Sequence, residues 1–450
     1  MENIKRDLTD IVNNEAKQFG CYSIFNRAMP HLIDGLKPAQ RFFLASCLED
    51  AKTKPAKIAS LSGNVSKYGY QHGEVSAGDA GILMCADWSN NINILEGRGN
   101  FGSRLVNAAA AQRYVYGKVH DNFDMLFSKD YNQNIKHPDD ENKIRQFFIP
   151  TIPLILSNGV MGIATGFKTV VLPHSTKWII KACNEYLTNG KITSKPVVQF
   201  PSFTGKVVDN KDGSFTQVGV YKINSPTSIT ITEIPTNFEW NTYLNHLDKL
   251  QDEGKIVRYT DGTGVGKFEF TIILKRGIDS SNVAKMNKLF KLEYKQTQLL
   301  NIVAPGDDLT DLSKLYTLKT YDDAKQVIKD FMDWKLKYSL PVRIKNEMDN
   351  AKRLSDIQQA KIKFITAVND NTIDLSKTTK KQLISLSKKL FNIDDEIAEV
   401  LARMPIYSLT TDELTSCRKR FKDLQKQYKY WAAETPESQY KLDLSEINLK

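Results

Sequence analysis

The sequence predicts a multidomain α+β protein, on three observations: its length, a β-rich middle region and a charged helical region beyond it. The chain has 450 residues, enough for about two to four domains of ordinary size. Its hydrophobic fraction of 41% can supply large cores. We expect a first domain over residues 1–155, a second over 156–320 and a third over 321–450.

Residues 1–155 mix helical patterns with glycine-rich turns. The sequence predicts a helix from Asp7 to Ala28 and a second from Ala39 to Ala51. Pro38 suits the first turn of the second helix, because the N–H group that proline lacks has no intrahelical partner there.

Residues 156–320 have a different character. The runs "SPTSITITEIP" and "KFEFTIILKRG" are rich in β-branched and aromatic residues, with turn residues between them. We therefore expect an α/β domain here.

Glycine does not occur after Gly306, and charged helical sequence follows. Within residues 410–434, apolar side chains recur at spacings of 3, 4, 3, 4 and 3, which is a heptad seam. The seam consists of Leu414, Cys417, Phe421, Leu424, Tyr428 and Trp431. Thr410 and Glu413 form a capping-box pattern at its start. With a second long helix upstream and a compact helical segment at about 373–408, this predicts an antiparallel coiled-coil arm with a helical tip. Pro341 predicts a kink or a break in the upstream helix.

Composition narrows the class of protein. The net charge of +10 favours polyanionic partners. The five cysteines are scattered and form no C-x-x-C pair, which argues against a disulfide framework or a cysteine-rich zinc site. The N-terminus lacks the apolar core of a signal peptide, and prolines interrupt the most apolar region, around residues 147–166. These features predict a soluble cytoplasmic protein without a membrane span.

The stretch "NAAAAQRYVYGKVH" places Arg113 and Tyr114 directly after an alanine run that has the composition of a short helix. A core aromatic residue beside a surface charge explains this pair as readily as a reactive tyrosine does. Further along the chain, Ile163 lies in the glycine-rich "SNGVMGIATGF". It suits either a core position or an exposed wedge that separates base steps and kinks a duplex.

Two other motifs also allow a structural and a functional interpretation. "GRGNFG", residues 97–102, matches the glycine pattern of a dinucleotide-binding turn, but no regular βαβ succession follows it. A turn that lets the backbone approach closely is the simpler interpretation. Arg27, Lys37 and Arg41 surround a turn and a helix start, which suits phosphate contacts or a solvated face.

Seven short segments occur in a fixed order: "DGLKPAQR", "YQHGE", "GRGNFGSR", "AAAAQRY", "NGVMGIATGF", "ITEIP" and "MPIYSLT". Together they resemble the breakage-reunion subunit of type IIA DNA topoisomerases, the family that comprises the A subunits of gyrase and topoisomerase IV and the C-terminal part of eukaryotic topoisomerase II. The phage members are the most similar in length, and the resemblance covers about residues 5–435. Gln40 stands where gyrase-type members carry histidine. Phe42 replaces a basic residue, which puts one phosphate contact in doubt.

The resemblance implies a winged-helix DNA-cleavage domain, an α/β tower domain, and a long antiparallel coiled coil with a helical dimer gate. It implies that Tyr114 forms a transient 5′-phosphotyrosyl bond and that Arg113 assists at the scissile phosphate. The remaining positions would contact DNA: Arg27, Lys37, Arg41, Lys67, His72, Arg98, Arg104 and Ile163.

The resemblance also implies partners. Double-stranded DNA would lie across a homodimer, and Mg²⁺ and ATP would be bound by partner subunits with the TOPRIM and ATPase domains. The protein would act in the cytoplasm, that of the host cell if the chain is viral. The alternative function is a non-catalytic winged-helix DNA-organising protein, which would share the basic face and Ile163 but make no use of Arg113 and Tyr114.

Overall fold

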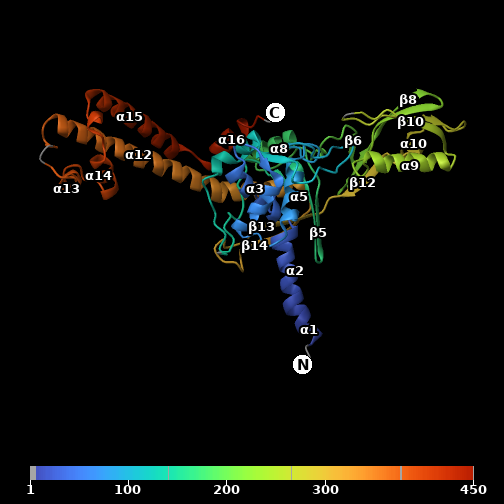
Figure 1. The fold of residues 1–450 in the computed structure, drawn as a ribbon, viewed down its shortest axis with the longest axis horizontal. Coiled ribbons are helices and arrows are strands. Elements are labelled where there is room, and N and C mark those ends of the chain that lie inside the picture. The colour runs from blue at the N-terminus through green and yellow to red at the C-terminus, as the bar shows by residue number, and fades with distance from the viewer. Residues whose placement is uncertain (1–6, 140, 265, 376–377, 449–450) are drawn as a thin grey trace. The chain divides into compact units, whose positions relative to one another are not determined.

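The computed structural model describes residues 7–139, 141–264, 266–375 and 378–448. The chain folds into two compact units (Figure 1). The larger contains residues up to Asp333 and the segment from Asp443 onward, and the smaller is Trp334–Leu442. Every candidate site residue named above belongs to the larger unit, so its elements position the site.

From Leu8 to Ala28 the chain forms one continuous helical run, in agreement with the helix predicted from Asp7 to Ala28. Asp7 caps it, because its side chain accepts a hydrogen bond from the Thr9 N–H group. Two π-helical turns interrupt the α-helical geometry. The segments are α1 (Leu8–Ile11), η1 (Val12–Ala16), α2 (Lys17–Ser23) and η2 (Ile24–Ala28).

Helices and a small antiparallel sheet in the order β1-β3-β2 follow. Helix α3 (Pro38–Asp50) carries Pro38 in its first turn, as predicted. It packs against α4 and α5. The other elements here are β1 (Ala56–Lys57), α4 (Ile58–Gly63), η3 (Asn64–Tyr68), α5 (Glu74–Cys85), β2 (Leu95–Arg98), β3 (Tyr116–Val119), α6 (Asp121–Phe127), η4 (Ser128–Asp130) and α7 (Leu154–Asn158).

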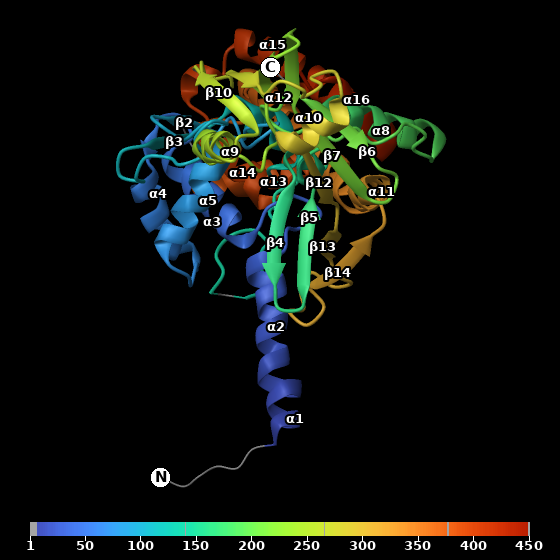
Figure 2. The same cartoon turned by 90° about the vertical axis from the view of Figure 1, so that its right-hand side faces the viewer.

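A hairpin of β4 (Val160–Ala164) and β5 (Phe167–Val171) projects beside the pair β13 (Leu300–Pro305) and β14 (Tyr316–Tyr321), as Figure 2 shows. Val170 of β5 bridges to Leu299, which fixes the base of the hairpin. Helix α8 (Thr176–Asn189) follows the hairpin.

The β-rich region forms a three-stranded sheet, β12-β7-β6, and a four-stranded sheet, β10-β11-β9-β8. The two runs predicted as strands are β9 and β11, which pair antiparallel. Tyr243 of α9 and Phe290, just after α10, share one core with Ile231 and Phe270 of these strands. The elements are β6 (Lys206–Asp209), β7 (Ser214–Val218), β8 (Val220–Ser225), β9 (Ser228–Glu233), α9 (Trp240–Asp252), β10 (Ile256–Asp261), β11 (Phe270–Leu274), α10 (Val283–Leu289), β12 (Glu293–Thr297) and α11 (Ala324–Trp334).

In the smaller unit, two long helices, α12 and α15, lie side by side (Figure 1). Cys417 is fully buried and the other five predicted seam positions are partly buried, while most other α15 side chains are exposed. A π-helical turn precedes α12, which carries Pro341 in its first turn, so the expected irregularity lies there. The elements are η5 (Lys335–Ser339), α12 (Leu340–Asn369), α13 (Lys380–Phe391), α14 (Asp395–Ala402), η6 (Ile406–Ser408), α15 (Thr411–Ala433) and α16 (Pro436–Ser445).

None of the helices in the described ranges has both the length and the apolar character that a membrane span requires.

Candidate functional site

Tyr114 closes a tight turn immediately before strand β3. Its N–H group donates a 2.8 Å hydrogen bond to the Ala111 carbonyl. The side chain is 64% exposed, and the Arg113 guanidinium carbon lies 4.7 Å from the centre of its ring. The structure therefore contradicts a core role for Tyr114 and presents a solvent-facing phenol with a cation beside it.

The alanine run before this turn is not helical, contrary to its composition. The Ala110 N–H group donates to the Asn100 carbonyl at 2.9 Å, and the Ser103 N–H group donates to the Val106 carbonyl at 2.7 Å. These bonds tie the segment to the preceding glycine-rich loop, and such tertiary contacts override the high helix propensity of alanine.

The turn itself is fastened to helix α5. The Gln112 side-chain amide donates to the Val75 carbonyl at 3.0 Å and to the Asp79 carboxylate at 2.8 Å. Gly78 makes this approach possible, since a Cβ atom there would lie 2.1 Å from Gln112 Oε1. Sequence reasoning missed the roles of Gln112, Gly78 and Asp79, because nothing in their local spacing distinguishes them from ordinary helix and turn residues.

A groove of about 650 Å³ runs beside α5 and brings Arg27, Lys37 and His72 together. Asp79, which holds the Tyr114 turn, also lines this groove. Burial lowers the pKa of Lys37. Two predicted cations and His72 thus share one concave surface with the helix that anchors Tyr114.

His72 and Lys67 both have partners on this side of the unit. His72 Nε2 lies 2.9 Å from the Tyr22 hydroxyl, and its ring meets Tyr70 edge-on. Lys67 forms an exposed 2.8 Å ion pair with Glu49. Exposed ion pairs contribute little to stability, about 0–1 kcal/mol, so Lys67 can exchange Glu49 for a phosphate at small cost.

Arg41 does not occupy the predicted DNA-contact position. Its guanidinium is buried, and it donates to the fully buried Asp34 carboxylate at 2.7 and 3.0 Å and to the Leu36 carbonyl at 3.1 Å. These bonds employ the donors that a phosphate would need. The expected phosphate contact at Arg41 is therefore corrected to a structural ion pair beneath the start of α3.

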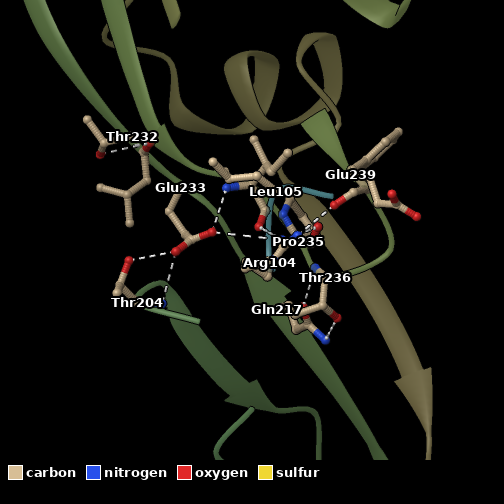
Figure 3. A network of polar contacts seen from close by, with 12 residues as sticks. Arg104, Leu105, Thr204, Gln217, Thr232, Glu233, Pro235, Thr236 and Glu239 are labelled. Carbon is tan, nitrogen blue, oxygen red and sulfur yellow. Dashed lines mark hydrogen bonds and ion pairs between the residues drawn. The ribbon is translucent and has the colours of Figure 1, made fainter. Parts of the chain in front are cut away.

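Arg104 is also largely removed from solvent, with 11% of its side chain exposed, and lies within the polar network of Figure 3. It donates to the backbone carbonyls of Phe238, Ile234 and Pro235 at 2.7, 2.8 and 2.9 Å. Its guanidinium also lies 3.9 Å from Glu233 and packs over the Phe268 ring. The expected DNA contact at Arg104 is corrected to a buried contact between two segments of the chain.

Arg27 and Arg98, by contrast, are exposed at the surface. Among the residues that the structure describes, neither side chain has a hydrogen-bond or ion-pair partner. Arg98 ends β2 and pairs in register with Tyr116 of β3, two residues after Tyr114. Both guanidinium groups are therefore available to an anionic ligand.

Ile163 lies near the end of the β4–β5 hairpin, opposite Lys168, and is 71% exposed. This exposure contradicts the core interpretation. Met161 is exposed on the same face of β4, whereas Gly162 faces the Ala28 carbonyl, which a Cβ atom would approach to 2.2 Å. Sequence reasoning missed Met161, although the period-two alternation in "VMGIA" places it on the same face as Ile163.

The dinucleotide interpretation of "GRGNFG" is wrong. β2 belongs to an antiparallel sheet, and the loop after it leads to the Tyr114 turn without an intervening helix. A dinucleotide site needs a parallel βαβ unit whose helix N-terminus meets the pyrophosphate. Here Gly99, with φ of +116°, and Gly102, with φ of +80°, allow a tight loop.

Residues 27–450 match the family of the A subunit of DNA gyrase/topoisomerase IV. The DNA topoisomerase medium subunit of Enterobacteria phage T4 is 37% identical over 98% of this chain and 99% of its own length. The A subunit of DNA topoisomerase 4 from Staphylococcus aureus is 26% identical over 94% of this chain and 56% of its own length. The crystal structure of the Plasmodium falciparum topoisomerase II DNA-binding, cleavage and re-ligation domain superposes with a TM-score of 0.82, at 26% identity, over 97% of this chain and 63% of that one.

Proposed function

Because this chain belongs to the family of DNA gyrase and topoisomerase IV A subunits, we propose that it cuts and rejoins DNA through Tyr114. Its function is that of the DNA-cleavage and religation subunit of a type II DNA topoisomerase, an isomerase that passes one duplex through a transient break in another. The observation that supports Tyr114 as its nucleophile is the solvent-facing phenol with Arg113 against its ring.

The reaction is a transesterification. The Tyr114 oxygen attacks a DNA phosphorus atom and loses its proton, and the bond from phosphorus to the 3′ oxygen breaks. The products are a 5′-phosphotyrosyl ester and a free 3′ hydroxyl. In religation that hydroxyl attacks the ester and displaces the tyrosine, so the bond energy is conserved. Arg113 donates hydrogen bonds to the phosphate oxygens as negative charge grows on them.

The duplex is held mainly by phosphate contacts, which position DNA without reading its sequence. Arg27, Lys37 and His72 supply such contacts from the groove, and Lys67 and Arg98 supply them from the adjoining surface. Ile163 inserts between base steps and kinks the duplex, which makes binding favour steps that unstack easily. Affinity should therefore depend strongly on salt.

We assign family terms to the elements as follows. The helices α3–α5 with the sheet β1-β3-β2 form the winged-helix cleavage domain, within residues 1–155. The β-rich sheets form the tower, within 156–320. Helices α12 and α15 form an antiparallel coiled coil, and the elements between them form a dimer gate, within 321–450. We propose that the protein acts as a homodimer in the cytoplasm, that of the host cell if the chain is viral.

Mg²⁺ and ATP belong to partner subunits in this proposal. The described residues contain no group of three or more His, Cys, Asp or Glu side chains placed to hold a metal ion. A partner's TOPRIM domain would hold the Mg²⁺, which would supply charge stabilisation for the leaving 3′ oxygen, and a partner's ATPase would bind the ATP.

The proposal is tested by trapping the covalent adduct with denaturant in the complex reconstituted with its ATPase and TOPRIM subunits, Mg²⁺ and supercoiled DNA. Tyr114→Phe should form no adduct and relax no DNA, yet bind DNA within about twofold of wild type, because only the nucleophilic oxygen is lost. Tyr116→Phe is the matched control, since Tyr116 is also exposed and lies two residues away. It should behave as wild type. Adducts that persist in Tyr114→Phe would exclude Tyr114 as the nucleophile.

A further inference from the structure

We propose that Arg104 is a positioning residue for Tyr114, acting through the backbone rather than through DNA. It fastens the loop of residues 103–107 to the connection between β9 and α9. The alanine run, residues 108–111, connects this loop to the Tyr114 turn. This inference rests on the proposed role of Tyr114 and adds a residue on which the cleavage rate depends.

Further contacts join the two segments besides those of Arg104, and we call the whole set the Arg104 joint. The Arg104 guanidinium spans the carbonyls of residues 234, 235 and 238. One residue on, the Leu105 carbonyl accepts from the Trp240 N–H group at 2.8 Å. The Asn107 N–H group donates to the Glu239 carboxylate at 3.2 Å. The loop is therefore held against one segment at residues 104, 105 and 107. Figure 3 shows Arg104 and Leu105 beside Pro235 and Glu239 of that segment.

The segment that receives the loop is itself firmly held. Glu233 accepts hydrogen bonds from both the N–H group and the hydroxyl of Thr204, at 3.0 and 2.7 Å. Thr236 and Gln217 exchange two hydrogen bonds of 2.8 Å. Glu239 begins α9 in a capping box with Thr242. A loop that docks on this segment is therefore held in a fixed position relative to the β-rich part of the unit.

The Tyr114 turn is consequently held from two directions. Gln112 fastens it to α5, and the Arg104 joint fastens the chain upstream of the alanine run. The alanine run between these two anchors is not helical, so it lacks the regular hydrogen bonds that would make it rigid. A small displacement of a reacting group can lower a rate about 100-fold, so the rate should respond to loss of either anchor.

Arginine is required for this role because of its shape. The two terminal nitrogens of the planar Arg104 guanidinium donate to three carbonyls. The ammonium group of a lysine cannot span all three in the same way. Arg104→Lys keeps the charge near Glu233 but loosens the joint, and Arg104→Ala removes the joint. Arg353→Gln is the matched control, since Arg353 is an exposed arginine of the smaller unit whose ion pair is with Glu396.

The experiment measures three quantities in the reconstituted complex: the rate of adduct formation, the DNA Kd at several salt concentrations, and the Tm of the chain. Arg104→Lys should slow adduct formation about 10-fold and Arg104→Ala more, with Kd and its salt slope unchanged within about twofold. Partial rescue by lysine, with DNA affinity intact, is the pattern that a DNA-contacting residue would not give.

Three results would overturn the inference. Adduct rates within about twofold of wild type in both variants would remove any positioning role. A higher DNA Kd, with a salt slope reduced by about one, would show that Arg104 contacts a DNA phosphate. Unfolding of both variants would leave it a structural role only. Failure of the wild-type complex to form an adduct at Tyr114 would instead overturn the proposed function, so the two failures are distinguishable.

Discussion

At the scale of single residues, Ile163 lies in an energetically unfavourable position for a free protein. With 71% of its side chain in water, it forgoes most of the roughly 1.5–3 kcal/mol that full burial of such a side chain contributes. Met161 is exposed beside it on the same face of β4. A partner that covers this face recovers that free energy, and the space between two base steps suits an apolar side chain.

We expect Ile163→Ala to reduce DNA bending and cleavage several-fold without destabilising the fold. Truncating an exposed side chain removes few packing contacts, so the free energy of unfolding should change by less than about 0.5 kcal/mol. Bending is measured by energy transfer between dyes at the ends of a duplex, and cleavage by the adduct assay. Ile223→Ala is the control, since Ile223 is an isoleucine of strand β8 that is also exposed, at 50%. Unchanged bending in Ile163→Ala would contradict the wedge.

The arginines show what sequence can and cannot assign at this scale. Arg27 and Arg98 are exposed at the surface, whereas Arg41 meets a carboxylate and Arg104 meets three carbonyls. A guanidinium binds phosphate, carboxylate and carbonyl oxygens with the same five donors. The motif gives the position of each arginine in the chain, but the fold decides which oxygen it meets. Arg41 pairs with Asp34 of its own motif, whereas the partners of Arg104 lie 130 residues or more away in the sequence.

At the scale of elements, the contact between α5 and the Tyr114 turn depends on a glycine, because no side chain would fit at that position. Gly78 lies in the interior of α5, where glycine destabilises a helix by roughly 0.5–1 kcal/mol relative to alanine. The helix tolerates this because Gln112 crosses at that point and bonds Val75 and Asp79. Local stability and correct placement of the turn therefore favour different residues at position 78.

Gly78→Ala should consequently separate stability from activity. The new Cβ atom would lie 2.1 Å from Gln112 Oε1, so the amide must move and lose its bonds to α5. Alanine's helix preference offsets that loss, so the free energy of unfolding should stay within about 1 kcal/mol of wild type. Adduct formation should fall several-fold. Thermal unfolding and the adduct assay measure the two effects.

Gly63→Ala provides the comparison for that substitution. Gly63 ends the neighbouring helix α4, and a Cβ atom there would meet nothing within 4 Å. It should leave adduct formation unchanged. Equal adduct rates in the two alanine variants would show that the Gln112 anchor does not matter.

Elements governed by local periodicity were predicted correctly. The helix at 38–50 and the seam of α15 follow from a first-turn proline and a heptad spacing, which act within the element. The alanine run was predicted wrongly, because its backbone pairs with Asn100 and the glycine-rich loop rather than with itself. Four alanines are too few to nucleate a helix against such competition.

At the scale of the whole molecule, one chain carries one Tyr114, but a double-strand break needs two nucleophiles. In the proposed function, a twofold dimer would supply both with symmetric geometry. The motif "MPIYSLT" places Ile406 and Tyr407 in the short helix η6 between α14 and α15, and both are 82% exposed. The three-domain order stays a prediction from the sequence, and a self-complementary surface cannot be predicted from it because that surface depends on which apolar side chains the fold leaves uncovered.

We therefore expect Ile406→Asp to weaken the homodimer. An aspartate in an apolar interface would lose its hydration without gaining a partner, so the dimer Kd should rise at least about 10-fold, equivalent to about 1.4 kcal/mol. Sedimentation velocity over a concentration series measures this, and the Tm should change little because Ile406 is exposed in the monomer. Val257→Asp places the same charge at an exposed apolar position of strand β10 and should leave the dimer intact. A dimer of unchanged affinity in Ile406→Asp would remove η6 from the interface and require the second Tyr114 to be brought to the duplex by another surface of the chain.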